Sequence, residues 1–430
     1  MSLNILLVTD AFPPTAGGSG WSTYELARGL RARGDRVLIV RPRPGGRRGM
    51  RIVEDAYDGF TVHELGTPSP RTPFVRNYVK NERLAPRLAS ALRDVIRRER
   101  IDIVHGQHLL STPGAIAAAR AEGLPCVATV RDYWPVCYWS DLIHDRLAPD
   151  LCPACSAGMM TRCIRPHGGA AWPAALPMIP YMRSNLAWKR RTLARADAIV
   201  AVSSTIARDL RARAPELANA RIDVIPNPLD LSVLDAAAAS DPPDLPRPYA
   251  IYVGKLAPNK GVRYLIPAVR RAGLRWPLVI AGDGPERGAV EQAARAAGID
   301  VRFTGWTPRD EALRLLAHAA LLVFPSHGPE SLSRVLLESG GLGVPAAAMD
   351  TGGTRDIIVH GETGLLSTSP EALGDDVRRL VEDEELRTRL GAGARAHVRS
   401  RFASQVVVQR MADLYDDLLS TPRRLDRRHA

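Results

Sequence analysis

The sequence has no run of uncharged, apolar residues long enough to cross a lipid bilayer. The longest candidate, residues 166–182, contains four prolines, and proline inside a helix removes a backbone hydrogen bond and breaks the helix. Residues 3–9 lack the basic segment and the cleavage site of a signal peptide, and their composition is that of a first β-strand. These absences lead us to expect a cytoplasmic protein.

Cysteine is scarce as well: there are five in 430 residues, and four of them are clustered as Cys137, Cys152, Cys155 and Cys163. Such a cluster suits a reducing compartment and a bound metal better than a disulfide framework. The C-x14-C-x2-C-x7-C spacing suits tetrahedral zinc, so we predict a structural zinc in a cysteine-rich insert at about 137–165. Four unligated thiols and an iron–sulfur cluster are the alternatives.

Acidic residues are too few to balance the basic ones, and the formal net charge is +12. Arginine supplies most of the excess, since the chain has only four lysines. The excess is either a compositional bias or a sign of anionic partners, such as nucleotide diphosphates, acidic polysaccharide or anionic lipid at the inner face of a membrane. The basic residues are scattered and no nucleic-acid recognition module is present, so we expect no nucleic acid partner.

The length of 430 residues predicts two or three domains, each with its own core. In the first half, strand patterns alternate with helical ones, which predicts a doubly wound parallel sheet. A glycine turn at 17–20 leads into a helix at 22–33, and residues 84–96 form an amphipathic helix. The predicted strands lie at 5–9, 37–40, 101–104, 127–130, 198–202 and 222–225.

A segment rich in proline, alanine and aspartate, residues 227–248, is typical of an interdomain linker. The strand–helix alternation then restarts, with strands at 249–254, 278–282, 301–303 and 320–324. We therefore predict an α/β protein with two Rossmann-like domains, 1–226 and 249–404, that face each other across a cleft. Residues 405–420 form a last helix, and 421–430 form a basic tail.

The most informative stretch is residues 329–338, Pro-Glu-Ser-Leu-Ser-Arg-Val-Leu-Leu-Glu. A buried strand pattern precedes it, Ser331 and Ser333 are good helix caps, and a helical pattern follows. The free amides of such a helix N-terminus favour a diphosphate. Glu338, one to two turns into the helix, is placed to bind ribose hydroxyls, and Glu330 faces a group beyond the phosphates.

This stretch, followed by Gly343-Val344-Pro345, resembles the E-x7-E signature of retaining glycosyltransferases of family 4. The resemblance implies the GT-B fold, with a last helix that crosses back to the first domain. It also implies a donor in which a sugar is linked to UDP or GDP, and an unidentified acceptor, with a lipid-linked molecule among the candidates. Further matching segments occur in the family's order at 13–14 (PP), 17–20 (GGSG), 252–256 (YVGKL), 259–261 (NKG), 280–285 (IAGDGP), 303–305 (FTG), 352–353 (GG) and 361–364 (GETG).

Two lysines, Lys255 and Lys260, follow the first strand of the second domain, and the matching basic pair of the family contacts the donor phosphates. Cations at that position stabilise the charge of a departing diphosphate. We find no D-x-D motif in the sequence, so we expect no catalytic metal. We predict Glu330, Lys255, Lys260, His108 and Arg131 as catalytic. The predicted donor-binding residues are Gly17, Gly18, Gly254, Lys255, Lys260, Gly284, Ser331, Leu332, Ser333 and Glu338.

The acceptor side departs from the family pattern. Many relatives have histidine in a T-x-H motif where this chain has Arg131. Arg131 is predicted to form a bidentate contact with a phosphate or an anionic acceptor. His105 and His108, which follow the strand at 101–104, are expected to point toward the cleft and position the acceptor, with a purely structural role as the alternative.

Aromatic and apolar residues between 171 and 191 precede Lys189-Arg190-Arg191. This combination indicates either a patch that contacts an anionic membrane or a helix packed on its own domain. The predicted function is retaining, metal-independent transfer of a sugar in the synthesis of cell-envelope polysaccharide, glycolipid or another glycoconjugate. The alternatives are a non-hydrolysing nucleotide-sugar epimerase of the same fold and a non-catalytic module that binds a nucleotide sugar or zinc.

Overall fold

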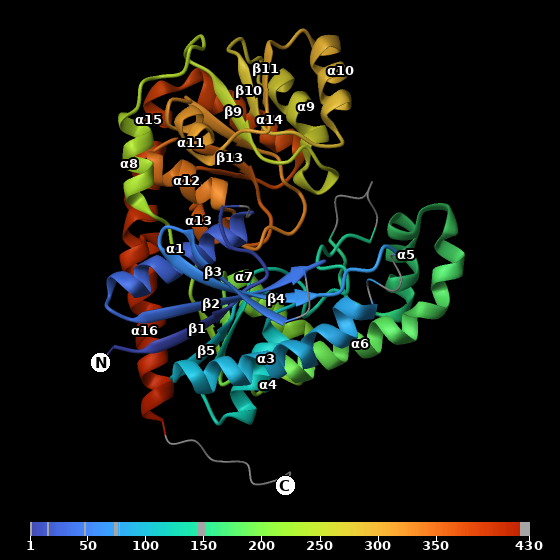
Figure 1. Ribbon diagram of the computed structural model, residues 1–430. Helices are drawn as coiled ribbons and strands as arrows, with labels where there is room; N and C mark the ends of the chain where they lie inside the picture. Colours follow the sequence, from blue (N-terminus) through green and yellow to red (C-terminus); the bar gives the residue numbers. More distant parts are fainter. Residues whose placement is uncertain are drawn as a thin grey trace.

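In the computed structural model the chain forms two domains, one above the other in Figure 1, and helices pack on both sheets. The structure describes residues 2–14, 17–46, 49–72, 76, 78–144 and 151–421. The first sheet has the order β3-β4-β2-β1-β5-β6-β7-β8. Its strands are β1 (Asn4–Val8), β2 (Arg36–Pro44), β3 (Gly49–Tyr57), β4 (Phe60–Thr67), β5 (Ile103–Gly106), β6 (Cys126–Val130), β7 (Ala198–Ala201) and β8 (Ile222–Val224). The first sheet is parallel except for β3, which pairs antiparallel with β4.

The second sheet has the order β11-β10-β9-β12-β13-β14 and is parallel throughout the described residues. Its central strands are short apolar runs buried on both faces, as expected where helices cover a parallel sheet. The predicted GT-B-like pair of Rossmann-like domains is thus confirmed. The strands are β9 (Ala250–Val253), β10 (Leu278–Ala281), β11 (Val301–Gly305), β12 (Leu321–Phe324), β13 (Ala346–Met349) and β14 (Leu365–Ser367).

The helices of the first domain alternate with its strands. The helix predicted to begin at Ser22 begins four residues earlier, at Gly18, so part of the predicted glycine turn is helical. The helical segments are α1 (Gly18–Ala32), η1 (Val79–Arg83), α3 (Leu84–Glu99), α4 (Thr112–Ala121), α5 (Ala157–Gly168), η2 (Gly169–Met178), α6 (Ile179–Leu193), α7 (Ser204–Arg213) and η3 (Pro215–Leu217).

The helices of the second domain end in a long pair that is broken at Ala403. They are α8 (Leu231–Ala239), η4 (Pro258–Lys260), η5 (Val262–Tyr264), α9 (Leu265–Arg271), α10 (Arg287–Ala297), α11 (Arg309–Ala317), α12 (Arg334–Leu342), α13 (Thr354–Ile357), α14 (Pro370–Glu382), α15 (Glu384–Phe402) and α16 (Ser404–Ser420). In the described part of the chain, no helix combines the length and the apolarity that a membrane crossing requires.

Two segments of the chain, around Leu229 and around Ala403, join the two domains and run side by side. The amide of Leu229 donates to Phe402 O, and the amide of Ser404 donates to Leu229 O, each at 2.8–2.9 Å. The segment predicted as a linker contains helix α8, which packs on α11 and α12 of the second domain. Helix α16 then returns along the first domain, as Figure 1 shows, and packs on α1. The predicted return of the last helix is confirmed; the tail from 422 onward lies outside the described residues.

Candidate functional site

Glu330 lies at the carboxyl edge of the second sheet, in the loop that joins β12 to α12. One of its oxygens, Oε1, accepts hydrogen bonds from Ser326 Oγ at 2.6 Å and from Lys260 Nζ at 2.5 Å. Lys260 lies in the loop after β9, the strand that pairs with β12. The two loops lie close together because the carboxyl ends of parallel strands meet at one edge of the sheet. Two residues predicted from separate motifs, Lys260 and Glu330, therefore form one ion pair. Lys255, from the same loop, is exposed.

Backbone segments approach each other closely around this loop. A Cβ at Gly352, which has a φ of +54°, would lie 1.9 Å from Glu330 O, so only glycine fits there. The amide of Gly353 donates to the same carbonyl at 2.7 Å. On the other side of the edge, a Cβ at Gly284 would lie 2.3 Å from Leu256 O. These contacts tie the loop after β12 to the loop after β13, and the loop after β9 to the loop after β10, with Gly254 at the start of the loop after β9.

The N-terminus of α12 follows directly. Ser333 caps the helix, and its Oγ accepts from the amide of Leu336. Leu332 is buried beneath the loop, whereas Ser331 is partly exposed. The first amides of the helix have no partner within the helix, which makes this end favourable for an anion. The capping predicted for Ser333 is what the structure shows.

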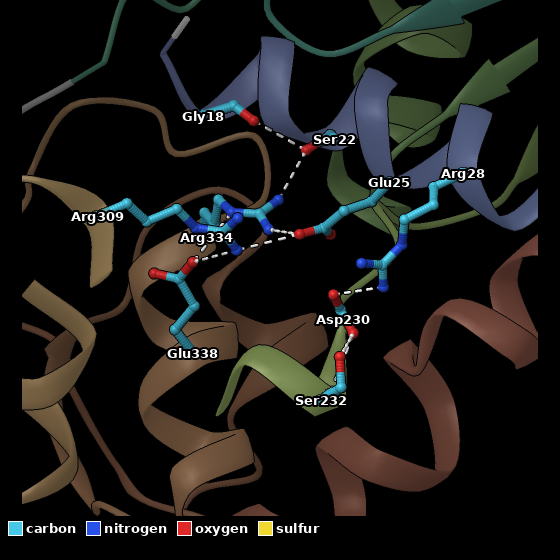
Figure 2. Close-up of polar contacts among 9 residues, drawn as sticks. All are labelled: Gly18, Ser22, Glu25, Arg28, Asp230, Ser232, Arg309, Arg334 and Glu338. Atoms are coloured by element: carbon cyan, nitrogen blue, oxygen red, sulfur yellow. Dashed lines mark hydrogen bonds and ion pairs between the residues drawn. The ribbon is translucent and has the colours of Figure 1, made fainter. Parts of the chain in front are cut away.

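Glu338 lies one turn into α12 and is held by two arginines, as Figure 2 shows. Its Oε1 accepts from Arg334 Nε at 3.0 Å and from Arg309 Nη2 at 3.3 Å. Both arginines also pair with Glu25 of α1, a residue of the first domain that is only 1% exposed. Burial raises the pKa of Glu25, and the charges of Arg334 and Arg309 oppose that rise. The four side chains form a cluster that spans the two domains, which we call the Glu25–Glu338 cluster.

The start of α1 completes this interface. Arg334 Nη1 donates to Ser22 Oγ at 3.3 Å, and Ser22 Oγ donates to Gly18 O at 3.0 Å (Figure 2). The guanidinium of Arg309 lies over the ring of Trp21 at 4.6 Å. Gly17 and Gly18 are exposed at the N-terminus of this helix, and a Cβ at Gly18 would lie 3.8 Å from the side chain of Arg334 in the second domain. The sequence motifs identified Gly17 and Gly18 but not Trp21, Glu25, Arg309 or Arg334.

Two carboxylates that the sequence reasoning did not single out lie on the first-domain side of the cleft. Asp10 follows β1 and accepts from the amides of Leu110 and Ser111 at 3.0 and 2.8 Å. Asp132 follows β6 and accepts from the amide of Trp134 at 2.8 Å. Both directly follow a buried strand, which was the available sequence signal.

These carboxylates have perturbed acidities. Burial, with the negative charge of Asp10, raises the pKa of Asp132 to about 6. Burial lowers the pKa of Lys189 to about 8, and Asp132 opposes that shift. Burial also raises the pKa of Asp10, while the charge of Lys80 acts in the opposite direction. Buried titratable groups gathered at a cleft are typical of functional sites.

Arg131 is 9% exposed and is engaged by the protein itself. Its Nη1 donates to Gln107 O at 2.8 Å and its Nε donates to Asn227 Oδ1 at 3.0 Å. Burial lowers its pKa to about 9. Asn227 belongs to the segment between the domains, so Arg131 ties that segment to the first sheet, and its contact with a phosphate or an acceptor stays a prediction.

The two histidines differ. His105 is fully buried, with Nδ1 2.6 Å from Tyr415 Oη and Nε2 2.6 Å from Thr129 Oγ1. The expectation that it points toward the cleft is therefore wrong, because it holds the returning helix α16 to the sheet. His108 lies beside Asp10, with its Nδ1 2.9 Å from Thr9 Oγ1. Burial, and then the charge of Arg131, lower its pKa to about 3, so its imidazole is neutral at pH 7.

The four clustered cysteines line one small apolar cavity beside α5. None of the four is in a disulfide. Burial raises the pKa of Cys137 to about 11 and of Cys163 to about 12. In the described part of the chain, no three histidine, cysteine or carboxylate side chains already stand where they would ligate one ion. The structure thus brings together Cys137, Cys152, Cys155 and Cys163 but does not show a formed metal site.

The apolar segment from 171 to 191 packs on this insert. Met182 is buried in a small core with Met160 and Ile164, and Trp172 packs against that core. Lys189 is buried, with its ammonium 5.4 Å from the ring of Tyr138. The alternative in which this segment packs on its own domain therefore accounts for these side chains.

Two family models match the chain over adjoining ranges. The model described as "Glycosyltransferase Family 4" matches residues 16–233, just over half of the chain, and "Glycosyl transferases group 1" matches residues 236–397. The chain belongs to glycosyltransferase family 4. The resemblance inferred from residues 329–338 and the accompanying glycine motifs is confirmed at the level of the family.

Curated members of the family show how far the similarity extends. An alpha-D-kanosaminyltransferase of Streptomyces kanamyceticus is 33% identical over 180 residues, which are 40% of this chain and 46% of that protein. A glycogen synthase of Mycobacterium tuberculosis is 27% identical over 440 residues, which are 96% of this chain and 94% of that protein. The chain thus spans less than half of the first relative and nearly all of the second.

Among solved structures, the Anabaena protein HepE in complex with UDP matches with a TM-score of 0.65 and 18% identity. The match covers 96% of this chain and 100% of that one. Identity at this level shows the shared GT-B fold alone.

Proposed function

We propose that this family 4 member is a glycosyltransferase that moves a sugar, with retention of configuration, from a nucleoside-diphosphate sugar to an acceptor held by the first domain. The observation that carries the proposal is the ion pair of Lys260 and Glu330 at the carboxyl edge of the second sheet, with the capped N-terminus of α12 and Glu338 beside it. Cation, helix N-terminus and carboxylate are the groups that a diphosphate and a ribose require.

The donor diphosphate is bound by Lys255, Lys260 and the first amides of α12. Lys260 leaves Glu330 for the phosphates when the donor enters, because a diphosphate offers it more negative charge than one carboxylate does. Positive charge that is already in place stabilises the leaving diphosphate as its charge develops. Glu330, released from Lys260, faces the sugar.

The nucleoside end is bound by Glu338, which accepts hydrogen bonds from the ribose hydroxyls. Arg309 and Arg334 hold Glu338 by a single oxygen, Oε1. Such fixed orientation lowers the entropy lost on binding. HepE was solved with UDP, which supports UDP as the nucleotide here, with GDP as the other candidate.

The transfer is proposed to be metal-independent, because the sequence has no D-x-D motif and two lysines stand at the phosphate position. The leaving phosphate takes the proton of the acceptor hydroxyl on the same face of the sugar, so no second carboxylate is needed as a nucleophile. A cytoplasmic location with peripheral contact to an anionic membrane stays a prediction.

We also propose that the cysteine cluster holds a structural zinc ion through Cys137, Cys152, Cys155 and Cys163. Support comes from the convergence of all four thiols on one apolar cavity, although they are separated by up to 26 positions. Binding requires the thiols to turn toward a common centre and to lose their protons. Zinc would then cross-link the loop after β6 to α5 without a disulfide.

The proposed glycosyltransferase activity is tested by incubating the protein with UDP- and GDP-sugars and measuring release of UDP or GDP. We expect release from at least one donor, which an added acceptor accelerates. The variant Arg302→Gln should retain the activity, because the exposed pair of Arg302 and Asp300 lies away from the loops around Glu330. Conversion of a donor to its epimer without nucleotide release would contradict the proposal.

A further inference from the structure

A cavity of about 360 Å³ lies at the carboxyl edge of the first sheet, where β2 and β4 end. The start of α3 and the loop after β5 close its other sides. The residues that line it are Pro42, Pro44, Thr67, Pro68, Ser69, Arg76, Val79, Lys80, Arg83, Leu84, Arg87 and Leu110.

Four cations line this cavity, and among the described residues that line it there is no carboxylate. Lys80 and Arg83 lie on η1 and Arg87 lies on the first turn of α3, and Arg76 precedes them in the sequence. Between Val79 and Arg83 the chain forms a π-helical turn, a local feature that often marks functional sites. We call these four side chains the cationic face.

The cationic face contrasts with the arginines around it. In the adjoining cavity, Arg41 and Arg43 both pair with Glu64. Further along α3, Arg93 and Arg97 both pair with Glu122. These neighbouring arginines are neutralised by carboxylates of the protein.

For the cationic face, no ion pair is found within the described residues of the chain. Glu82 lies on the same turn as Lys80 and Arg83, but it accepts from Tyr181 Oη at 2.7 Å and from Asn185 Nδ2 at 3.4 Å and so faces α6. Four positive charges thus line one cavity, and no carboxylate of the described residues forms an ion pair with any of them. Such a place attracts a multiply charged anion more strongly than a single carboxylate.

The cavity adjoins the groups of the cleft. Leu110, which lines it, donates its amide to Asp10. The charge of Lys80 is felt by Asp10 and by Lys189, and Asp10 in turn acts on Asp132. Tyr133, the next residue, feels the charge of Glu330 across the cleft. The cavity therefore adjoins, through Leu110, the loop that holds Asp10.

We propose that this cavity binds the acceptor through a phosphate or diphosphate ester, which Lys80, Arg83 and their two neighbours grip. The inference rests on the proposed function, since it names the substrate class of the acceptor side of the same cleft. Arginine forks match phosphate oxygens in pairs, and lysine adds a point charge. The prolines, Leu84 and Leu110 contact the carbon framework attached to the phosphate.

The experiment uses calorimetry on the full chain saturated with UDP, so that the donor site is occupied, and inorganic pyrophosphate as the probe. The wild type should bind pyrophosphate. The double variant Lys80→Gln/Arg83→Gln should bind it about tenfold more weakly or worse, because two charge-assisted contacts are lost. The control Arg93→Gln/Arg97→Gln removes the same charge from the adjoining helix α3, outside the cavity, and should bind like the wild type.

Two further probes separate the sources of the phosphate. Tighter binding of geranyl diphosphate than of pyrophosphate assigns the cavity to a lipid-linked acceptor, and equal binding assigns it to a soluble phosphate ester. Pyrophosphate binding that both double variants weaken equally would overturn the proposal. So would wild-type protein that binds only phosphatidylglycerol vesicles through these residues, since the cationic face would then serve a membrane surface.

The failure of this inference is distinguishable from failure of the proposed function. If the protein binds UDP and slowly hydrolyses a donor sugar but does not bind pyrophosphate, the acceptor assignment alone is overturned. Protein that binds neither UDP nor GDP would overturn the proposed function itself.

Discussion

At the scale of single residues, three charged side chains near one sheet edge make up the proposed donor site. Lys260 and Glu330 are paired at 2.5 Å, and Glu338 is held by Arg309 and Arg334. Each side chain is thus already oriented by a partner, which reduces the ordering that substrate binding must supply.

Glu338→Ala should weaken binding of the free nucleoside diphosphate, because a carboxylate that accepts from ribose hydroxyls contributes about 1.5–3 kcal/mol. Glu330→Ala should instead lower turnover while binding of UDP or GDP stays close to that of the wild type. Calorimetry with the nucleotide and initial rates with its sugar check the two halves. Equal nucleotide affinity in all three proteins would mean that the donor site is placed wrongly.

Asp132 predicts a pH-dependent effect on stability. Burial raises its pKa from 3.8 to about 6 in the folded state, so the folded state holds the proton more tightly than the unfolded state does. Stability from this group is therefore lost as pH rises from about 4 to about 6. Asp132→Asn should raise the free energy of unfolding at pH 7.5 by roughly 3 kcal/mol and change it little at pH 3.5. Chemical denaturation at both pH values is the check, and an equal loss at both would refute this interpretation.

The sequence could predict Lys260, Glu330, Ser333 and Glu338 because each belongs to a local strand–loop–helix pattern. It could not predict the partners of Glu338, since Glu25 and Arg334 are 309 positions apart and no local spacing records their contact. The spacing of Arg76, Lys80, Arg83 and Arg87 was present in the sequence. That spacing became informative only once the structure showed that the four residues line one cavity and that no carboxylate is among its described lining residues.

At the scale of elements, the Glu25–Glu338 cluster joins α1 of the first domain to α11 and α12 of the second (Figure 2). The charges are buried, so removal of one partner leaves the others without compensation.

Glu25→Gln should therefore destabilise the protein by about 3 kcal/mol or more and loosen the contact between the domains. Small-angle scattering should show a larger radius of gyration than in the wild type. Asp375→Asn is the matched control, because it breaks exposed pairs with Arg271 and Arg378 inside the second domain alone. A wild-type radius and stability for Glu25→Gln would show that the cluster does not hold the domains together.

The cysteine-rich insert gives a second prediction for an element. Cys155→Ser should lower zinc content and destabilise the loop between β6 and α5, with nucleotide binding unchanged, because the insert lies on the first domain. Cys126→Ala, which alters the fifth cysteine in β6, should keep the metal. Elemental analysis of protein purified without chelator decides the matter, and a content near zero for zinc in the wild type would contradict the proposal.

The elements that the sequence did not predict are those with weak or interrupted patterns. The β3–β4 hairpin turns at Asp58-Gly59, both with positive φ, and its outer strand β3 is largely exposed, so it lacks a clear apolar alternation. Strand β13 has the sequence Ala-Ala-Ala-Met, a composition that favours helix, and its pairing with β12 and β14 makes it a strand. Helix α8 was concealed by the prolines around it.

At the scale of the whole molecule, two Rossmann-like domains place the carboxyl edges of both sheets at one cleft, and the crossing at Leu229 and Phe402 with the return of α16 joins them. The alternation of strands and helices made this arrangement predictable, since right-handed crossovers allow few others. The proposed donor-binding groups lie on the second domain, and the cationic face and Asp132 lie on the first. This division supports transfer of a sugar from a donor held by the second domain to an acceptor held by the first.

The most direct measurement is proton NMR of the slow hydrolysis of the bound donor, an α-linked UDP- or GDP-sugar, in the absence of acceptor. We expect the sugar to appear first as the α-anomer and to equilibrate with the β-anomer only later, and we expect Glu330→Ala to release it far more slowly. First appearance of the β-anomer, or an undiminished rate in Glu330→Ala, would contradict retaining transfer at this site.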